Sequence, residues 1–168
     1  MSAGPRAVLI GPMGAGKTTV GAILAAAWGV ALRDTDADVE AAEGRSVSDI
    51  FVESGEAVFR ELEAAAVAEA LATHDGVLAL GGGAVLDPRT RELLAGHPVV
   101  FLRVGLSDAV SRVGLGVGRP LLLGNVRSRV KALLDERTPI YESVATISVD
   151  TDGRTPEDVA SEIQEALR

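Results

Sequence analysis

Short apolar segments recur along the chain, each followed by Gly or Asp and then by a stretch with helical spacing. The segments lack in–out alternation, which is typical of strands covered on both faces, and the helical stretches between them favour parallel pairing. The pattern therefore predicts an α/β fold, a three-layer doubly wound domain built on a parallel sheet. The predicted strands are residues 7–10, 30–32, 77–80, 99–104 and 145–149.

Several predicted helices carry capping signals. Gly29 stands where a left-handed C-cap belongs, after an apolar stripe that includes Trp28, which we interpret as a packing residue rather than a ligand platform. Asp87-Pro88 and Thr155-Pro156 each combine an N-cap residue with proline at the first helical position. A long helix is predicted over residues 56–74.

Residues 113–124 break this rhythm. The segment contains four glycines and predicts a mobile loop, and long irregular loops in compact domains often act as lids. The sequence shows no internal repeat and no linker to a second domain. We therefore expect residues 1–168 to form a single domain with a mobile lid.

Composition narrows the possible functions. The net charge of −8 argues against nucleic-acid binding, and the absence of cysteine excludes disulfides, thiolate zinc sites and cysteine nucleophiles. No stretch approaches the roughly 20 apolar residues of a membrane span, and none resembles a signal peptide. We expect a cytoplasmic protein without a membrane or nucleic-acid partner, in which any site for an anion carries local positive charge.

The segment GPMGAGKTT, residues 11–19, follows the first predicted strand and opens the first helix. It fits the phosphate-binding pattern G-x-x-x-x-G-K-T, in which backbone N–H groups and the helix N-terminus hold an anion. Lys17 can reach the terminal phosphates and the Thr18 hydroxyl can bind Mg²⁺. The alternative is an ordinary glycine turn that only allows the strand and the helix to pack closely. The sequence predicts a P-loop NTPase with its loop at residues 11–18; the expected ATP-binding residues here are Gly14, Ala15, Gly16, Lys17, Thr18 and Thr19.

Two other nucleotide classes fit less well. The dinucleotide pattern G-x-G-x-x-G, started at Gly14, would place Thr19 at its last glycine. A GTPase would be expected to carry Asn-Lys-x-Asp, but neither Lys17 nor Lys131 follows an asparagine. ATP is therefore the expected nucleotide.

Polar residues follow the second and third predicted strands. Asp34 and Asp36 should lie near bound phosphates, because ligands gather at the carboxyl ends of parallel strands. Two carboxylates two residues apart lie on the same side of an extended segment and could serve a metal and a substrate hydroxyl, although each could instead cap the next helix. Glycines 81–83 would open backbone N–H groups to a ligand. Arg60 and Glu63 could form an ordinary surface ion pair.

Taken together, six segments resemble the shikimate kinase family over essentially the whole chain. They are GPMGAGKTTVG at 11–21, DTD at 34–36, FRELE at 59–63, LGGGAV at 80–85, GRPLL at 118–122 and ERTPIY at 136–141. The resemblance implies a five-stranded parallel sheet in the order 2-3-1-4-5 and a monomer. It also implies transfer of the γ-phosphoryl group of ATP to the 3-hydroxyl of shikimate, on the way to chorismate and the aromatic amino acids.

The resemblance further implies roles for individual residues. The substrate-binding residues would be Asp36 for the shikimate hydroxyls, Arg60 and Arg137 for its carboxylate, and Gly81, Gly82 and Gly83 along the pocket, with the shikimate-binding region spanning about residues 34–63. Glu63 would orient Arg60. Lys17, Asp36 and the lid residue Arg119 would be catalytic, and Arg119 would also contact ATP. Thr18 would bind Mg²⁺ directly and Asp34 through water. Arg112, Arg154 and Pro156 would flank the adenine.

Two rival functions remain at this point. A small kinase for another hydroxylated acid, such as gluconate, would share the P-loop and the lid but would not be expected to combine DTD, FRxxE and GGG. A catalytically silent nucleotide-binding regulator would have no need to keep Lys17, Asp36 and Arg119.

Overall fold

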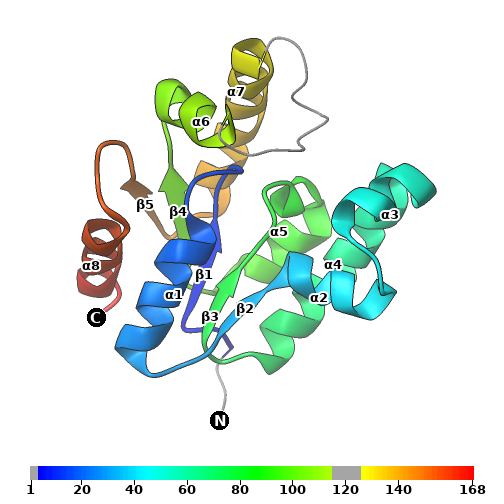
Figure 1. The fold of residues 1–168 in the computed structure, drawn as a ribbon. Helices are drawn as coiled ribbons and strands as arrows, with labels where there is room; N and C mark the ends of the chain where they lie inside the picture. Colours follow the sequence, from blue (N-terminus) through cyan, green and yellow to red (C-terminus); the bar gives the residue numbers. More distant parts are fainter. Residues whose placement is uncertain (1–3, 115–125) are drawn as a thin grey trace.

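The computed structural model describes residues 4–114 and 126–168. Among these residues, five strands form a parallel sheet in the order β2-β3-β1-β4-β5 (Figure 1). The strands are β1 (Ala7–Ile10), β2 (Leu32–Asp34), β3 (Val77–Ala79), β4 (Val99–Arg103) and β5 (Ile147–Asp150). The predicted fold class and strand order are confirmed.

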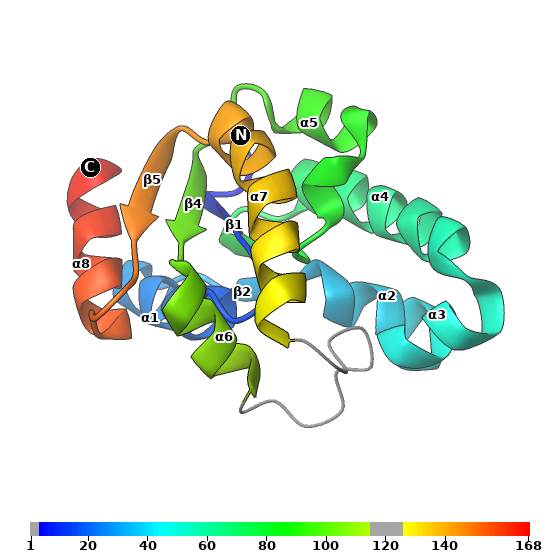
Figure 2. The ribbon, with the colours of Figure 1, turned by 90° about the horizontal axis from the view of Figure 1, so that it is seen from above.

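Helices cover both faces of the sheet (Figures 1 and 2). On β1, Leu9 faces a buried cluster shared with helices α1 and α8, whereas Val8 and Ile10 face a second cluster shared with α4, α5 and α7. Helices α2 and α3 lie beside α4, beyond the β2 edge. The bounds are α1 (Lys17–Trp28), α2 (Thr35–Glu43), α3 (Val47–Ser54), α4 (Glu56–Thr73), the 3-10 turn η1 (Ala84–Leu86), α5 (Pro88–Leu94), α6 (Leu106–Gly114), α7 (Val126–Val144) and α8 (Pro156–Ala166).

The second and fifth strands begin two residues later than predicted, and the first predicted residue of each, Val30 or Ala145, is hydrogen-bonded to the end of the preceding helix instead. Gly29 adopts a left-handed conformation with φ 66°, and the Val30 N–H donates to the Ala25 carbonyl at 2.9 Å. This is a Schellman ending, so Val30 completes α1 and does not pair in the sheet. Similarly, the Ala145 N–H donates to the Tyr141 carbonyl at 3.1 Å and belongs to the end of α7.

The predicted N-caps at Asp87 and Thr155 and the packing role of Trp28 are confirmed. Asp87 and Thr155 accept backbone N–H groups at the starts of α5 and α8, and the long helix α4 ends one residue short of the prediction. Trp28 is half-buried against the α1–α8 cluster, and the Arg6 guanidinium lies 4.5 Å from its ring centroid. In the described parts of the chain, no helix combines the length and apolarity needed to cross a membrane. Arg119 and most of the predicted lid at 113–124 lie outside the described residues.

Candidate active site

The loop between β1 and α1 is shaped to receive an anion. Gly14 and Gly16 have φ angles of 81° and 94°, a region that favours glycine. Gly16 is the N-cap of α1. No side chain caps this end of the helix, and the first turn of α1 contains no acidic residue. The N-terminal backbone N–H groups of α1 are therefore left without a side-chain acceptor, and they can serve a phosphate.

Lys17 folds back over this loop. Its Nζ donates to the carbonyls of Gly11 at 2.6 Å and Pro12 at 2.9 Å. Burial lowers the pKa of Lys17 from 10.5 to about 8, and the nearby charges of Asp36 and Asp34 oppose this shift only in part. A bound phosphate would stabilise the ammonium form, because an adjacent negative charge raises the pKa of an amine.

We expect ATP binding to take up protons at alkaline pH. Near pH 8.5 a substantial share of the free protein carries neutral Lys17, and the bound phosphates would recharge it. Calorimetry in buffers with different ionisation enthalpies should show a fractional proton uptake at about pH 8.5 and little at about pH 6.5. The uptake should vanish in Lys17→Met; an equal uptake in this variant would assign the proton to another group.

Asp34 ends β2 and caps α2. Its Oδ1 accepts the N–H of Asp36 at 2.8 Å and of Ala37 at 3.4 Å. The chain therefore turns into a helix at Thr35, and the prediction that residues 34–36 form an extended segment with both carboxylates on one side is wrong. The capping alternative applies to Asp34, whereas Asp36 lies in the first turn of α2.

Asp36 presents a buried acceptor to the site. A Cβ added to Gly81 would lie 2.7 Å from Asp36 Oδ1 and 2.9 Å from Glu63 Oε2, so both carboxylates lie against this glycine. Within the described chain, Asp36 Oδ1 is buried and has no hydrogen-bond partner. Burial raises the pKa of Asp36 and the charge of Asp34 adds to the shift, while Lys17 opposes it. A substrate hydroxyl would satisfy this acceptor.

Arg60 is held by a buried carboxylate on its own helix. Its Nη1 lies 2.8 Å from Oε1 of Glu63, whose exposed fraction is only 3%, and its Nη2 lies 3.3 Å from Glu56 Oε2. An ordinary surface pair is thereby excluded, and the predicted orienting role of Glu63 agrees with this contact. Burial raises the pKa of Glu63, and the hydrogen bond from Arg60 opposes the shift.

The three glycines 81–83, which we call the glycine wall, join these groups to the P-loop. A Cβ on Gly83 would lie 2.5 Å from both Nη atoms of Arg60. A Cβ on Gly82 would lie 3.5 Å from the Met13 N and 3.8 Å from Arg137 Nη1. Asp36, Arg60 and Arg137 thus meet around the wall, as predicted. Like Asp36 Oδ1, Arg137 Nε is buried and has no hydrogen-bond partner among the described residues.

If the sequence-based prediction of shikimate as the acceptor is correct, Gly83→Ala should weaken its binding without unfolding the protein. The backbone of Gly83 has φ −102°, which alanine adopts readily, and the nearest atoms to the new methyl group belong to the Arg60 guanidinium, which would have to move. The KM for shikimate should rise by about tenfold or more, since a displaced guanidinium loses charge-assisted hydrogen bonds. The KM for ATP and the melting temperature serve as internal controls, and an unchanged KM for shikimate would contradict the placement of Arg60.

A cleft of about 260 Å³ lies between the P-loop and α8. Arg112 closes one side of it: its Nη1 donates to the Gly14 carbonyl at 3.0 Å and to Thr151 Oγ1 at 3.2 Å. The cleft is lined by Gly14, Ala15, Gly16, Thr19, Val20, Arg112, Thr151, Arg154, Pro156 and Val159. The residues predicted to flank the adenine are thus brought together. Thr151 was missed, although its place directly after β5 at the carboxyl edge of the sheet was a usable signal.

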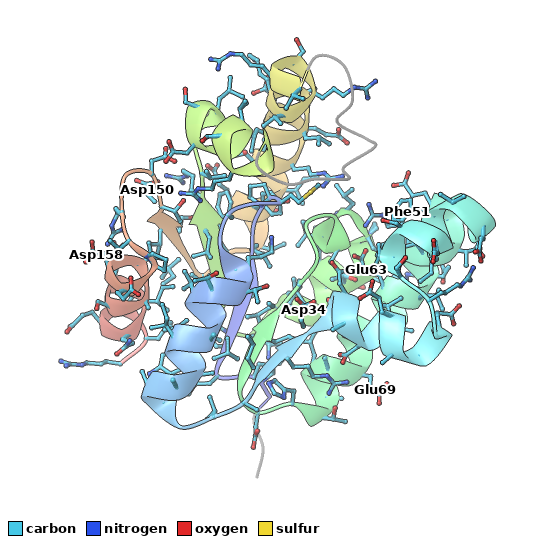
Figure 3. All side chains as sticks on the ribbon, viewed as in Figure 1. Asp34, Phe51, Glu63, Glu69, Asp150 and Asp158 are labelled. Atoms are coloured by element: carbon cyan, nitrogen blue, oxygen red, sulfur yellow. The ribbon has the colours of Figure 1, made fainter. Side chains whose placement is uncertain are left out.

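The cleft and the acceptor groups lie on different sides of the P-loop. In Figure 3, Asp150 and Asp158 mark the β5–α8 side, whereas Glu63 and Phe51 mark the α3–α4 side. Phe51 of α3 packs on Phe59 of α4 with ring centroids 4.8 Å apart, and this contact holds α3 against α4. The geometry provides a cleft that could take a nucleotide on one side of the phosphate-binding loop, and the polar groups around the glycine wall on the other side.

Comparison with known proteins agrees with this arrangement. A sequence model of the shikimate kinase family matches residues 13–168. The chain belongs to the shikimate kinase family. Shikimate kinases from Thermobifida fusca and Salinispora arenicola are each 60% identical to it, over 99% and 97% of this chain and 97% and 98% of their own lengths.

Solved shikimate kinases share the fold. A structure of the Acinetobacter baumannii shikimate kinase in complex with shikimate has a TM-score of 0.92 and 34% identity, and the match covers 98% of this chain and 92% of that one. A gluconokinase from Sinorhizobium meliloti has a TM-score of 0.62 at 22% identity, which shows a common fold alone. The sequence-based assignment to the shikimate kinase family is confirmed.

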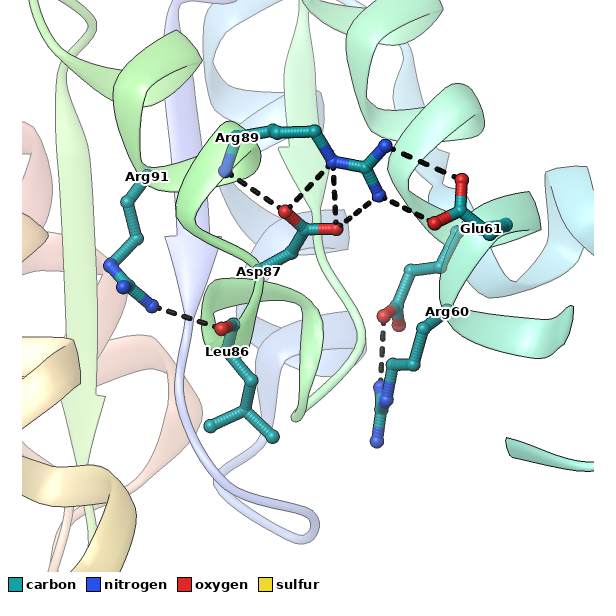
Figure 4. Close-up of polar contacts among 7 residues, drawn as sticks. Arg60, Glu61, Leu86, Asp87, Arg89 and Arg91 are labelled. Carbon is teal, nitrogen blue, oxygen red and sulfur yellow. Dashed lines mark hydrogen bonds and ion pairs between the residues drawn. The ribbon is translucent and has the colours of Figure 1, made fainter. Parts of the chain in front are cut away.

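In this shikimate kinase family member, a surface network of polar contacts connects α4 to the segment after the glycine wall (Figure 4). Arg89 Nη2 lies 2.7 Å from Asp87 Oδ2 and 2.9 Å from Glu61 Oε1, and Arg91 Nη1 donates to the Leu86 carbonyl at 3.0 Å. The sequence pattern did not reveal these contacts. Because Arg89 and Glu61 are exposed, we expect a small contribution to stability.

Thr18 and Asp34, the two residues predicted to serve Mg²⁺, lie where a magnesium ion could bind beside the phosphates. Thr18 is the last residue of the P-loop and lies in the first turn of α1, and Asp34 lies at the same edge of the sheet. Among the described residues, no group of three or more acidic or histidine side chains forms a metal cage. Mg²⁺ usually takes one or two protein ligands and completes its shell with phosphate oxygens and water, so one hydroxyl and one carboxylate would suit it.

Proposed function

We propose that the chain transfers the γ-phosphoryl group of ATP to the 3-hydroxyl of shikimate, which gives shikimate 3-phosphate and ADP on the way to chorismate. The observation that carries this proposal is the meeting of Asp36, Arg60 and Arg137 around the glycine wall, beside the P-loop. Shikimate is a small ring with a carboxylate at one end and hydroxyls at the other. Two arginines and one carboxylate acceptor match that polarity.

The proposed chemistry depends on alignment and charge neutralisation. Phosphoryl transfer needs an in-line acceptor and compensation of the charge on the phosphate oxygens. Lys17 would supply charge at the P-loop, while Asp36 would accept a hydrogen bond from the attacking hydroxyl. The raised pKa of Asp36 brings this carboxylate nearer to the range in which it can accept that proton.

Mg²⁺ belongs to this proposal, with Thr18 and Asp34 as its protein partners, the latter through water. When bound, the ion would neutralise charge on the transferring phosphate. We also propose that residues 113–124 act as the lid, that Arg119 contacts the transferring phosphate, and that closure excludes competing water. The proposal also includes a monomer made of one domain and a cytoplasmic location. It includes neither a nucleic-acid nor a membrane partner.

The proposal is tested by ADP release in a coupled assay with ATP and Mg²⁺. Release should depend on shikimate and should be near background with gluconate at the same concentration. Turnover with gluconate but not shikimate would favour the rival sugar-acid kinase. Nucleotide binding without turnover of either acid would favour a silent regulator.

A further inference from the structure

We propose that Tyr141 is a positioning residue for the shikimate pocket, whose hydroxyl holds the glycine wall and Arg137 in place relative to the P-loop. The inference rests on the proposed function, because its readout is the use of shikimate. Tyr141 lies outside the groups that would touch either substrate. Its influence would pass through the Gly82 carbonyl and the Arg137 side chain.

The first observation is a hydrogen bond across a long stretch of chain. Tyr141 Oη donates to the Gly82 carbonyl at 2.5 Å, although the two residues are 59 positions apart. Tyr141 has an exposed fraction of only 1%. A phenol hydroxyl has one hydrogen to donate, and Tyr141 donates it to the carbonyl of Gly82, the middle residue of the glycine wall.

The second observation is the anchoring of the phenol ring on the sheet. The ring packs on Phe101 of β4, with centroids 5.0 Å apart. Phe101 is the parallel partner of Ile10, the last residue of β1 before the P-loop. Tyr141 therefore connects the sheet, at the level where the P-loop begins, to the wall that lines the acceptor pocket.

The third observation concerns Arg137, which precedes Tyr141 by four residues on α7 and so shares its helix face. Arg137 Nη1 would lie 3.8 Å from a Cβ on Gly82, so the arginine and the phenol converge on the same glycine. Burial raises the pKa of Tyr141 to about 12, although the Arg137 guanidinium opposes the shift. The hydroxyl thus keeps its donor hydrogen at neutral pH.

These contacts predict an effect on one substrate only. Tyr141 does not line the nucleotide cleft, whose described residues come from the P-loop, α1, α6 and the β5–α8 region. Loss of the hydroxyl would leave the Gly82 carbonyl without this donor and would allow the wall and Arg137 to shift. Binding of the shikimate carboxylate would weaken, while ATP binding would be preserved.

The test is Tyr141→Phe, which keeps the ring and removes the hydroxyl. We expect the KM for shikimate to rise about five- to tenfold, a range consistent with the loss of one hydrogen bond, with less than a twofold change in the KM for ATP. Ser143→Ala is the matched control, because it removes an exposed hydroxyl from the same helix, where this hydroxyl donates to the Ile140 carbonyl at 2.7 Å. This control should leave both constants unchanged.

A double-mutant cycle separates positioning from simple packing. In an Arg137→Lys background, Tyr141→Phe should change the KM for shikimate much less than in the wild type, because both changes act at Gly82, where the two side chains converge. A lower melting temperature with an unchanged KM for shikimate would overturn the inference, as would equal rises in both KM values or full additivity with Arg137→Lys. A wild-type protein that does not use shikimate would contradict the proposed function instead.

Discussion

Asp36→Asn is expected to abolish measurable shikimate phosphorylation while leaving ATP affinity within about twofold of the wild type. The buried Oδ1 of Asp36 lies against the glycine wall and away from the nucleotide cleft, so its loss should affect the acceptor and not the donor. Removal of a general base or a positioning acceptor typically lowers rates by about 10²- to 10⁴-fold. Turnover and ATP titration should be measured on the same preparation.

The same variant should be more stable than the wild type at neutral pH. Burial raises the pKa of Asp36 above its unfolded value of 3.8, so the folded state binds the proton more tightly than the unfolded chain. The folded state therefore loses stability as the pH rises from 3.8 through the raised pKa, and the loss persists at higher pH. Asn carries no charge, so Asp36→Asn should melt at a higher temperature at pH 7, with the difference shrinking towards pH 4.

Two outcomes would contradict this account of Asp36. A collapse of ATP affinity in Asp36→Asn would place the carboxylate in the nucleotide site. A lower melting temperature at pH 7, with a difference from the wild type that persists towards pH 4, would mean that its contacts stabilise the fold more than its buried charge destabilises it.

Arg60→Ala is expected to raise the KM for shikimate by about 10- to 100-fold, since hydrogen bonds to a charged group are among the stronger polar contacts. The guanidinium lies at the glycine wall, fixed by Glu63 at 2.8 Å. Removal of Arg60 also leaves the buried Glu63 carboxylate without its partner, which should lower the melting temperature. The KM for ATP should change little.

The Arg60→Ala/Glu63→Gln double variant separates these two effects. Neutral glutamine should recover much of the lost stability, because no unpaired charge remains buried, but it should not restore shikimate binding. Arg89→Ala is the matched surface control, since Arg89 pairs with the neighbouring Glu61 and is exposed. Recovery of shikimate affinity in the double variant would show that Arg60 acts on the fold and not on the substrate.

Local signals explain why much of the fold was predictable. The apolar run at 7–10, the glycines of the P-loop and the caps at Asp87 and Thr155 act over a few residues, and the structure agrees with each of them. The start of α2 was not predictable in this way. Asp34 and Asp36 are both good cap residues, and only the observed bond from the Asp36 N–H to Asp34 Oδ1 decides between them.

The acceptor pocket depends on contacts that local patterns do not carry. From their spacing alone, Arg60 and Glu63 were predicted to form at most a surface ion pair. In the structure, Glu63 is buried against Gly81, and the pair is therefore part of the site. The strand order brings these segments together, because β3 and β4 flank β1 and ligands gather at the carboxyl ends of the strands, at the point where the strand order reverses. The bond from Tyr141 to Gly82 likewise spans 59 positions.

The central claim is that the P-loop delivers phosphate to the 3-hydroxyl of shikimate in a pocket made by Asp36, Arg60 and Arg137. The most direct measurement is identification of the product by ³¹P–¹H correlation NMR after incubation with ATP, Mg²⁺ and shikimate. The account predicts a single phosphate ester that couples to the proton on carbon 3, formed together with ADP. An ester at another hydroxyl, or ATP consumed to free phosphate with shikimate unchanged, would contradict it.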